Sequence, residues 1–183
     1  MLHSGHDPGR QAHMAMLAGR LGYSAVHVLD DGAITGDRLD ALVAAAAPAV
    51  VVIDSGASAP GLVRGRHPEL VRAARASLDA AGDSRPVIVA MPVAIGRTRN
   101  EAVARAARDP RFADADHPEV CGIFGTFEQG QEQVIELARA GAGVLLVTVA
   151  DDVDVADLLA QVRALVSGPV RKLLAEDGGG APD

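Results

Sequence analysis

The sequence predicts an α/β protein whose strands run parallel to one another. Helical and strand patterns alternate along almost all of the 183 residues, which is typical of parallel strands joined by right-handed crossover helices. Continuous apolar runs mark the strands, as expected where a strand is covered on both faces. The four clear strands are too few for a closed eight-stranded barrel, which needs roughly 200 residues or more.

The first helix and the strand after it have clear end signals. Asp7 is expected to cap free backbone N–H groups, Pro8 suits the first helical position, and Gly22 ends the helix. Apolar residues recur between these ends at the spacing of one helical face. Residues 25–29 then form a short strand that ends at a pair of aspartates.

The next segment repeats the order of helix and strand. Residues 37–47 form a helix that a proline ends, and residues 49–53 are a continuous apolar run, which predicts a buried parallel strand. Residues 57–66 are rich in Gly, Pro and Ser, so a loop is expected there. Pro68 begins the third helix, which a turn at residues 82–85 follows.

The middle of the chain contains the longest apolar strand, residues 87–95. Pro92 interrupts it, which predicts a bulge, a bend or an early end of the strand. Thr98 begins a capping box, and a helix over residues 99–108 follows. Residues 109–120 are expected to form a loop.

The last third of the chain continues the alternation. A short strand is expected at residues 121–124, and Thr126 begins a helix with a second capping box. Residues 143–149 form the last strand. The final helix has its apolar side within residues 155–166. Residues 176–183, which include three consecutive glycines, are expected to be disordered.

Charge and composition exclude several classes of protein. The net charge is −7 and Lys172 is the only lysine, so we expect no nucleic-acid binding by a basic patch. No apolar stretch is long enough for a membrane span or typical of a signal peptide. Cys121 is the only cysteine, which suits a reducing compartment. We therefore expect a cytoplasmic protein with a single domain over residues 1–175.

Polar residues follow several strands, and ligands collect at the carboxyl ends of strands in parallel α/β folds. The candidate cofactor-binding residues at these ends are Asp30, Asp54, Ser55, Arg97, Thr98, Gly125 and Thr126. Arg97 is the best candidate for an anion contact, because it precedes a helix N-terminus that favours phosphate. Ordinary turn and cap roles explain the same residue types. The sequence selects no catalytic residue, and no metal site is expected.

Three stretches together resemble luciferase-like monooxygenases. They are residues 17–28 (LAGRLGYSAVHV), residues 93–102 (VAIGRTRNEA), and residues 125–129 (GTFEQ) with residues 137–142 (LARAGA). The resemblance implies an incomplete or shortened (β/α) barrel of the TIM type. It also implies that residues 4–7 correspond to the loop after a first barrel strand that this chain lacks.

The resemblance implies a flavoprotein. The expected function is that of a flavin- or deazaflavin-dependent oxidoreductase or monooxygenase acting on a small organic substrate, with FMN or a deazaflavin coenzyme as cofactor. The alternatives are a cofactor-less barrel remnant that serves as a binding or partner subunit, and an unrelated doubly wound α/β enzyme. Unclosed sheets leave strand edges that proteins usually cover, so a homodimer, or a heterodimer with a homologous subunit, is expected.

Overall fold

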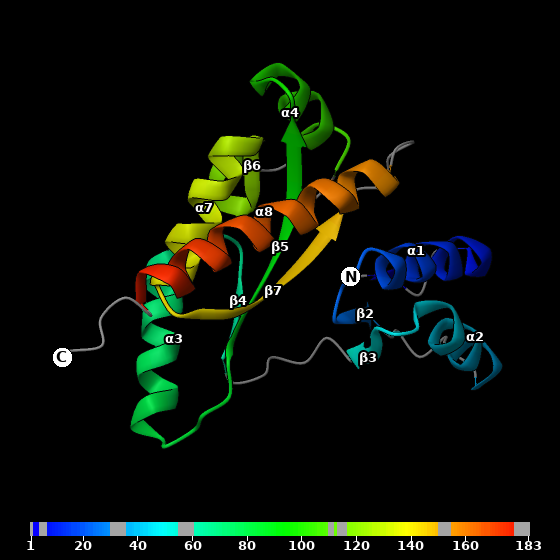
Figure 1. Ribbon diagram of the computed structural model, residues 1–183, viewed down its shortest axis with the longest axis horizontal. Coiled ribbons are helices and arrows are strands. Elements are labelled where there is room, and N and C mark those ends of the chain that lie inside the picture. Colours follow the sequence, from blue (N-terminus) through cyan, green and yellow to red (C-terminus); the bar gives the residue numbers. More distant parts are fainter. Residues whose placement is uncertain are drawn as a thin grey trace. The chain divides into compact units, whose positions relative to one another are not determined.

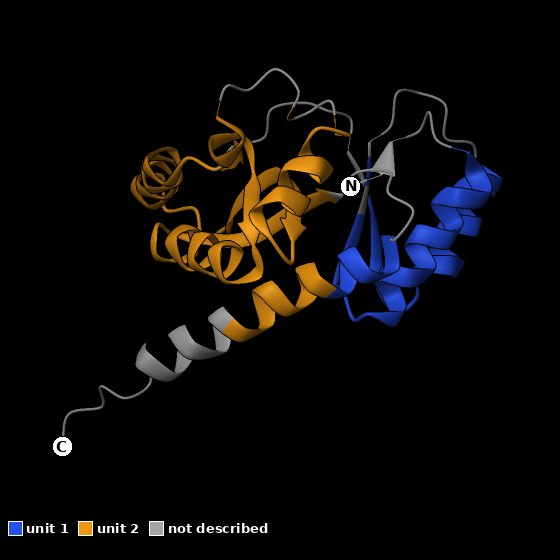
Figure 2. Cartoon of the chain, turned by 90° about the horizontal axis from the view of Figure 1, so that it is seen from above, with its two compact units in different colours: residues 1–58, 153–160 blue, residues 59–152, 161–183 orange. Residues whose placement is uncertain are grey.

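The computed structural model describes residues 2–3, 7–29, 36–54, 61–109, 112, 117–149 and 155–177. The chain divides into two compact units, each with its own sheet (Figure 2). Unit 1 comprises residues 1–58 and 153–160, and unit 2 comprises residues 59–152 and 161–183. Compactness alone does not show that either unit folds by itself. The single domain over residues 1–175 therefore stays a prediction.

Unit 1 has a three-stranded parallel sheet in the order β1-β2-β3. The strands are β1 (Leu2–His3), β2 (Ala25–Leu29) and β3 (Val50–Asp54). The helices α1 (Pro8–Arg20) and α2 (Gly36–Ala46) connect them and pack against each other. The predicted helix over residues 37–47 and the predicted strand over residues 49–53 are thus each confirmed to within one residue at either end.

The beginning of the chain differs from the expectation that the first strand is missing. Leu2 and His3 form β1 and pair in parallel with Val28 and Leu29. Two residues are too few to give a periodic apolar pattern, which is why the sequence did not reveal this strand. The start of α1 is as predicted, since the Asp7 side chain accepts a hydrogen bond of 3.0 Å from the N–H of Arg10.

Small residues allow the two helices of unit 1 to lie close together. A Cβ atom on Gly19 would lie 2.3 Å from the carbonyl oxygen of Ala46, so α1 can approach the end of α2 only because residue 19 has no side chain. Their shared core is built mainly from small apolar residues, as the lack of aromatics in the sequence requires. Its buried members are Ala15, Ala18, Val26, Val28, Leu42, Ala46 and Ala49.

Unit 2 contains four parallel strands around a long central strand, β5 (Val87–Gly96). Its neighbours are β4 (Leu62–Arg64), β6 (Ile123–Thr126) and β7 (Ala142–Val149). Within β5, Val89 pairs with both β4 and β7, and Val93 pairs with both β6 and β7. Therefore β7 occupies one edge of β5, while β4 and then β6 share the opposite edge (Figure 1).

The position where β4 gives way to β6 explains how β5 accommodates Pro92. The N–H of Ile88 and the carbonyl of Ala90 bond to the segment containing β4, so alternate residues of β5 face that edge. Pro92 belongs to the same set, and its missing N–H faces the gap between the two short strands. The predicted early end of the strand is wrong, because β5 runs through Pro92 to Gly96, and its register shift lies at Val87 and Ile88 rather than at Pro92.

Five helices in the described residues contribute to unit 2. They are α3 (Pro68–Ala80), α4 (Arg99–Ala106), α6 (Pro118–Cys121), α7 (Phe127–Arg139) and α8 (Val155–Asp177), whose first six residues belong to unit 1. The helices α3 and α7 pack against the sheet and against each other. Two expected loops contain regular structure, since β4 lies within residues 57–66 and α6 begins at Pro118, within residues 109–120, and ends at Cys121. Both elements are too short to show a period in the sequence.

The second half of β5 is buried on both faces, as the sequence predicted for a parallel strand. On one face, Ala94 packs in a cluster with Phe112, Phe124 and two alanines of α4. On the other, Ile95 lies near Gly130 of α7.

All strand pairs in the described residues are parallel, and neither sheet closes on itself. This arrangement confirms the predicted α/β class with an incomplete barrel. None of the helices in the described part of the chain is long and apolar enough to cross a membrane. The helix α8 includes Glu176 and Asp177, whereas the rest of the predicted tail lies outside the described residues.

Candidate functional site

The structure brings together four of the seven residues that the sequence selected. Ile95 pairs with Gly125 and Gly96 pairs with Thr126 across the parallel strands β5 and β6. Arg97 and Thr98, which follow Gly96, therefore lie at the same sheet edge as Gly125 and Thr126. Asp54 ends β3 in unit 1, and Asp30 and Ser55 lie outside the described residues.

The N-terminus of α4 is capped by side chains of its own segment. The hydroxyl of Thr98 accepts a hydrogen bond of 3.2 Å from the N–H of Glu101. The Glu101 carboxylate in turn accepts a hydrogen bond of 2.9 Å from the N–H of Arg97. This backbone bond is the main reason that the pKa of Glu101 lies below its ordinary value. The Arg97 side chain is 89% exposed and approaches the same carboxylate at 3.4 Å.

The N-terminus of α7 is capped in a similar way. Thr126 and Gln129 form the predicted capping box, in which each side chain accepts a hydrogen bond from the backbone N–H of the other. Glu128 adds a negative charge in the first turn. Its own backbone N–H, and then the Thr126 hydroxyl, lower the pKa of the Glu128 carboxyl. Gly125 precedes the cap with a φ of 128°, a conformation that favours glycine.

These caps bear on the expected phosphate of FMN or a deazaflavin coenzyme. A phosphate at a helix N-terminus needs free N–H groups and a positive local potential. At both helices, side chains already accept hydrogen bonds from N–H groups, and Glu101 and Glu128 place carboxylates where the phosphate would lie. The described residues of this edge therefore do not fit such a group. Coenzyme binding, and the role of the seven selected residues in it, stays a prediction.

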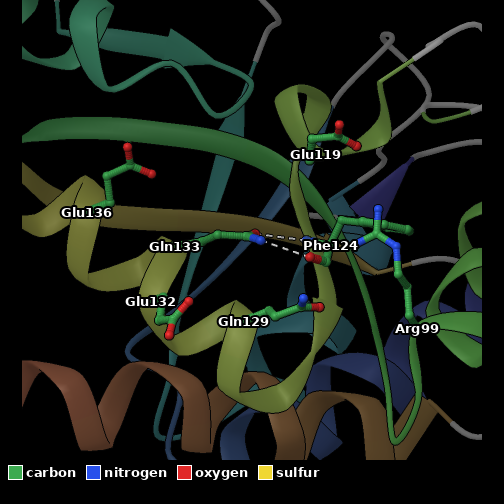
Figure 3. Close-up of a pocket in the computed structure, with 7 residues that line it drawn as sticks. All are labelled: Arg99, Glu119, Phe124, Gln129, Glu132, Gln133 and Glu136. Atoms are coloured by element: carbon green, nitrogen blue, oxygen red, sulfur yellow. Dashed lines mark hydrogen bonds between the residues drawn. The ribbon is translucent and has the colours of Figure 1, made fainter.

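A hollow of about 450 Å³ lies beside β6, between α6, α7 and the first turn of α4. We call it the β6 pocket. Its lining residues are Arg99, Glu119, Phe124, Gln129, Glu132, Gln133 and Glu136 (Figure 3). Four of these residues form a stripe along α7 at helical spacing.

Gln133 fixes the relation between α7 and β6. Its amide oxygen accepts a hydrogen bond of 3.0 Å from the N–H of Phe124, and its amide nitrogen donates one of 2.8 Å to the Phe124 carbonyl. In a parallel ladder both groups of one residue point to the same edge. Both Phe124 groups bond to Gln133, so they point away from β5. The Gln133 side chain thus takes the place of a neighbouring strand.

The acidic residues of the β6 pocket have different partners. The Arg66 guanidinium lies 2.6 Å from the Glu136 carboxylate and also donates a hydrogen bond of 2.6 Å to the carbonyl of Glu119. The pKa of the Glu119 carboxyl is lowered by its own backbone N–H and by His117, whose ring lies 3.5 Å away. Within the described residues, Glu132 forms neither a hydrogen bond nor an ion pair, so its charge faces solvent and the pocket.

Arg99 is the only cationic residue among the described residues that line the pocket. It lies at the first position of α4, with its guanidinium carbon 5.2 Å from the centre of the Phe124 ring. It forms no ion pair with any residue that the structure describes. Figure 3 shows Arg99 on one side of the pocket and Glu132 and Glu136 on the other, with Gln133 and Phe124 between them.

Sequence reasoning missed this pocket. Gln129, Glu132, Gln133 and Glu136 follow the spacing of one helical face, and such a polar stripe is what the solvated face of any surface helix shows. Only the position of α6 and the open edge of β6 turn this stripe into the wall of a hollow. Within the described ranges, no group of three or more His, Cys, Asp or Glu residues could hold a metal ion.

Comparisons with known proteins found no matching family model and no matching curated protein. Among solved structures, the chain is similar to (S)-3-O-geranylgeranylglyceryl phosphate synthase from Thermoplasma acidophilum, solved in complex with its substrate sn-glycerol-1-phosphate. The two share 14% identity, and the match covers 90% of this chain and 92% of that chain with a TM-score of 0.39. A similarity at this level assigns no function to the chain.

The comparisons contradict the resemblance to luciferase-like monooxygenases. No model of that family and no curated member of it matches the sequence. The expectation of an oxidoreductase or monooxygenase is therefore wrong, and the alternative of a barrel remnant acting as a partner subunit has no support. The three stretches consist mainly of helix caps and Ala-Gly helix ends. These recur across α/β folds because they satisfy helix termini in general.

Proposed function

We propose that unit 2 binds a small polar molecule with a positively charged group in the β6 pocket. The observation that carries this proposal is the placement of three carboxylates, from Glu119, Glu132 and Glu136, around one hollow beside a single lining arginine. A hollow lined by one sign of charge concentrates ions of the opposite sign. The ligand is therefore expected to be cationic over at least part of its surface.

The state of each carboxylate supports this assignment. Glu136 already has Arg66 as an ion-pair partner, and Glu119 has His117 beside it. Glu132 has no such partner in the described part of the chain and is therefore the carboxylate best placed to bind the charged group. The volume of about 450 Å³ is within the range of small-molecule sites. The polar lining suits a hydrophilic ligand rather than an apolar one.

The test uses cadaverine, a small diamine, as the probe. Isothermal titration calorimetry compares the unmodified protein with Glu132→Gln, which removes the charge and keeps the shape. Loss of one charge-assisted bond should weaken binding by about 1.5–3 kcal/mol. The control is Glu69→Gln, the same change on the exposed surface of α3 outside the pocket, which should leave affinity unchanged. Added salt should weaken binding to the unmodified protein.

Two results would contradict the proposal. One is the absence of measurable cadaverine binding to the unmodified protein at low salt. The other is equal binding by the Glu132→Gln and Glu69→Gln variants, which would mean that the diamine responds to net charge rather than to the pocket.

A further inference from the structure

Arg99 differs from an arginine that only stabilises the fold, because it lacks an ion-pair partner among the described residues. Its side chain is exposed and rests against Phe124, yet it forms no ion pair with the described residues. Contact with the face of the Phe124 ring restricts the Arg99 side chain and leaves its N–H groups available. A planar guanidinium in a fixed position is well suited to bind a carboxylate through two parallel hydrogen bonds.

The other cation near the pocket cannot take this role. Arg66 is committed to the Glu119 carbonyl and to the Glu136 carboxylate, both at 2.6 Å. That pairing also neutralises Glu136. Glu119 lies beside the His117 ring, which is charged only when protonated, and the charge of Arg99 helps to lower the pKa of Glu119. Glu132 and Arg99 are the two lining charges with no ionisable partner within ion-pair distance among the described residues. They come from different helices and lie on opposite sides of the pocket (Figure 3).

Gln129 adds a neutral donor between these two charges. Its side-chain oxygen accepts the hydrogen bond from the N–H of Thr126, which fixes the amide in place. Its NH₂ group has no partner in the described part of the chain and belongs to the pocket lining. The pocket therefore offers a carboxylate on one side, a guanidinium on the other and an amide donor between them (Figure 3).

We infer that the ligand of the β6 pocket is a zwitterion of the amino-acid type. Its ammonium group would bind to Glu132, and its carboxylate to Arg99 with help from the Gln129 amide. This inference rests on the proposed function. It adds that the ligand also carries a carboxylate. Arg99 is then the residue that distinguishes an amino acid from a simple amine.

A matched pair of probes tests this assignment. Lysine and cadaverine differ only by the carboxylate of lysine, so calorimetry with both isolates the contribution of that group. The unmodified protein should bind lysine about tenfold more tightly than cadaverine, as one charge-assisted bond predicts. In Arg99→Gln the two affinities should come within about twofold of each other, because lysine binding weakens. Arg99→Lys should retain part of the preference, since it keeps the charge but loses the planar fork.

Arg72→Gln is the matched control, because Arg72 is an exposed arginine on α3 outside the pocket lining. It should show the lysine preference of the unmodified protein. The zwitterion assignment is wrong if the unmodified protein binds cadaverine at least as tightly as lysine, or if Arg99→Gln keeps the preference for lysine. In either case the proposal that the pocket binds a cationic ligand is unaffected. If neither probe binds, the proposed function itself fails.

Discussion

At the scale of single residues, hydrogen bonds lower the pKa of carboxylates near the surface, as Asp83 shows. Asp83 lies in the turn before β5, where its carboxylate pairs with the Arg85 guanidinium and accepts a hydrogen bond of 3.0 Å from the Arg85 N–H. These hydrogen bonds lower the pKa of Asp83 from 3.8 to about 2. The bond from the Arg85 side chain has the largest effect, and the bond from the Arg85 backbone has the second largest. Solvent screens this pair, so its effect on stability is modest.

The lowered pKa of Asp83 predicts a pH-dependent contribution to stability. A group whose pKa is lower in the folded state stabilises the fold when it is charged, and that contribution disappears as the pH falls from about 4 to about 2. Asp83→Asn should therefore lower the melting temperature near neutral pH and change it little near pH 2. Thermal unfolding followed by circular dichroism measures the difference. Asp40→Asn, at an exposed position on α2, is the control, and an equal loss for Asp83→Asn at both pH values would contradict the prediction.

At the scale of elements, the short strand β6 depends on α7 for its outer edge. The two hydrogen bonds from Gln133 satisfy the N–H and carbonyl groups of Phe124, which would otherwise face the pocket without a partner. Phe124 as a whole is buried, with 2% of its surface exposed. Phe124 is thus fixed both by the hydrogen bonds of its backbone to Gln133 and by the packing of its side chain.

Removal of the Gln133 amide should destabilise the protein. Gln133→Leu leaves two backbone groups of Phe124 without partners, and the expected loss is about 1–3 kcal/mol of unfolding free energy. Urea denaturation measures this loss, and faster hydrogen exchange at the Phe124 amide would locate it. Gln131→Leu serves as the control, because Gln131 is on the same helix and makes no hydrogen bond within the described residues. Equal stability of the two variants would show that the edge needs no cover.

At the scale of the whole molecule, association with a second copy stays a prediction. In the described part of unit 1, β3 pairs only with β2, and its first residue, Val50, is 63% exposed. An exposed apolar side chain on an edge strand favours pairing with another chain. The β6 edge is less open than expected, because Gln133 covers it. An interface through β3 is therefore the more specific form of the predicted dimer.

Light scattering tests this dimer directly. At micromolar concentration the mass should be about twice the 18.7 kDa of the chain, and Val50→Lys should return it to the mass of a single chain. Val43→Lys, at an exposed position on α2, is the control and should leave the dimer intact. A single-chain mass for the unmodified protein would contradict the prediction, and a dimer that survives Val50→Lys would exclude the β3 edge.

The sequence was informative wherever a local pattern carries its own physical cause. Two helix starts could be predicted from local pairs, Asp7 with Pro8 and Thr126 with Gln129. Such caps are visible in the sequence because they bond to N–H groups within one turn of the chain. The buried strand β5 is visible because a strand covered on both faces must be apolar throughout. The short elements β1, β4 and α6 were missed, since two to four residues cannot display a period.

The candidate site divides in the same way. The sequence by itself determined the α/β class, the parallel strands and the helix caps at the ends of β5 and β6, because each of these depends on residues within a few positions of one another. Only the tertiary structure decided that Arg99, Glu119 and Glu132 surround one pocket. The physical reason is that segments distant in sequence form the pocket. The neighbours of each charged group in it therefore cannot be predicted from a local sequence pattern.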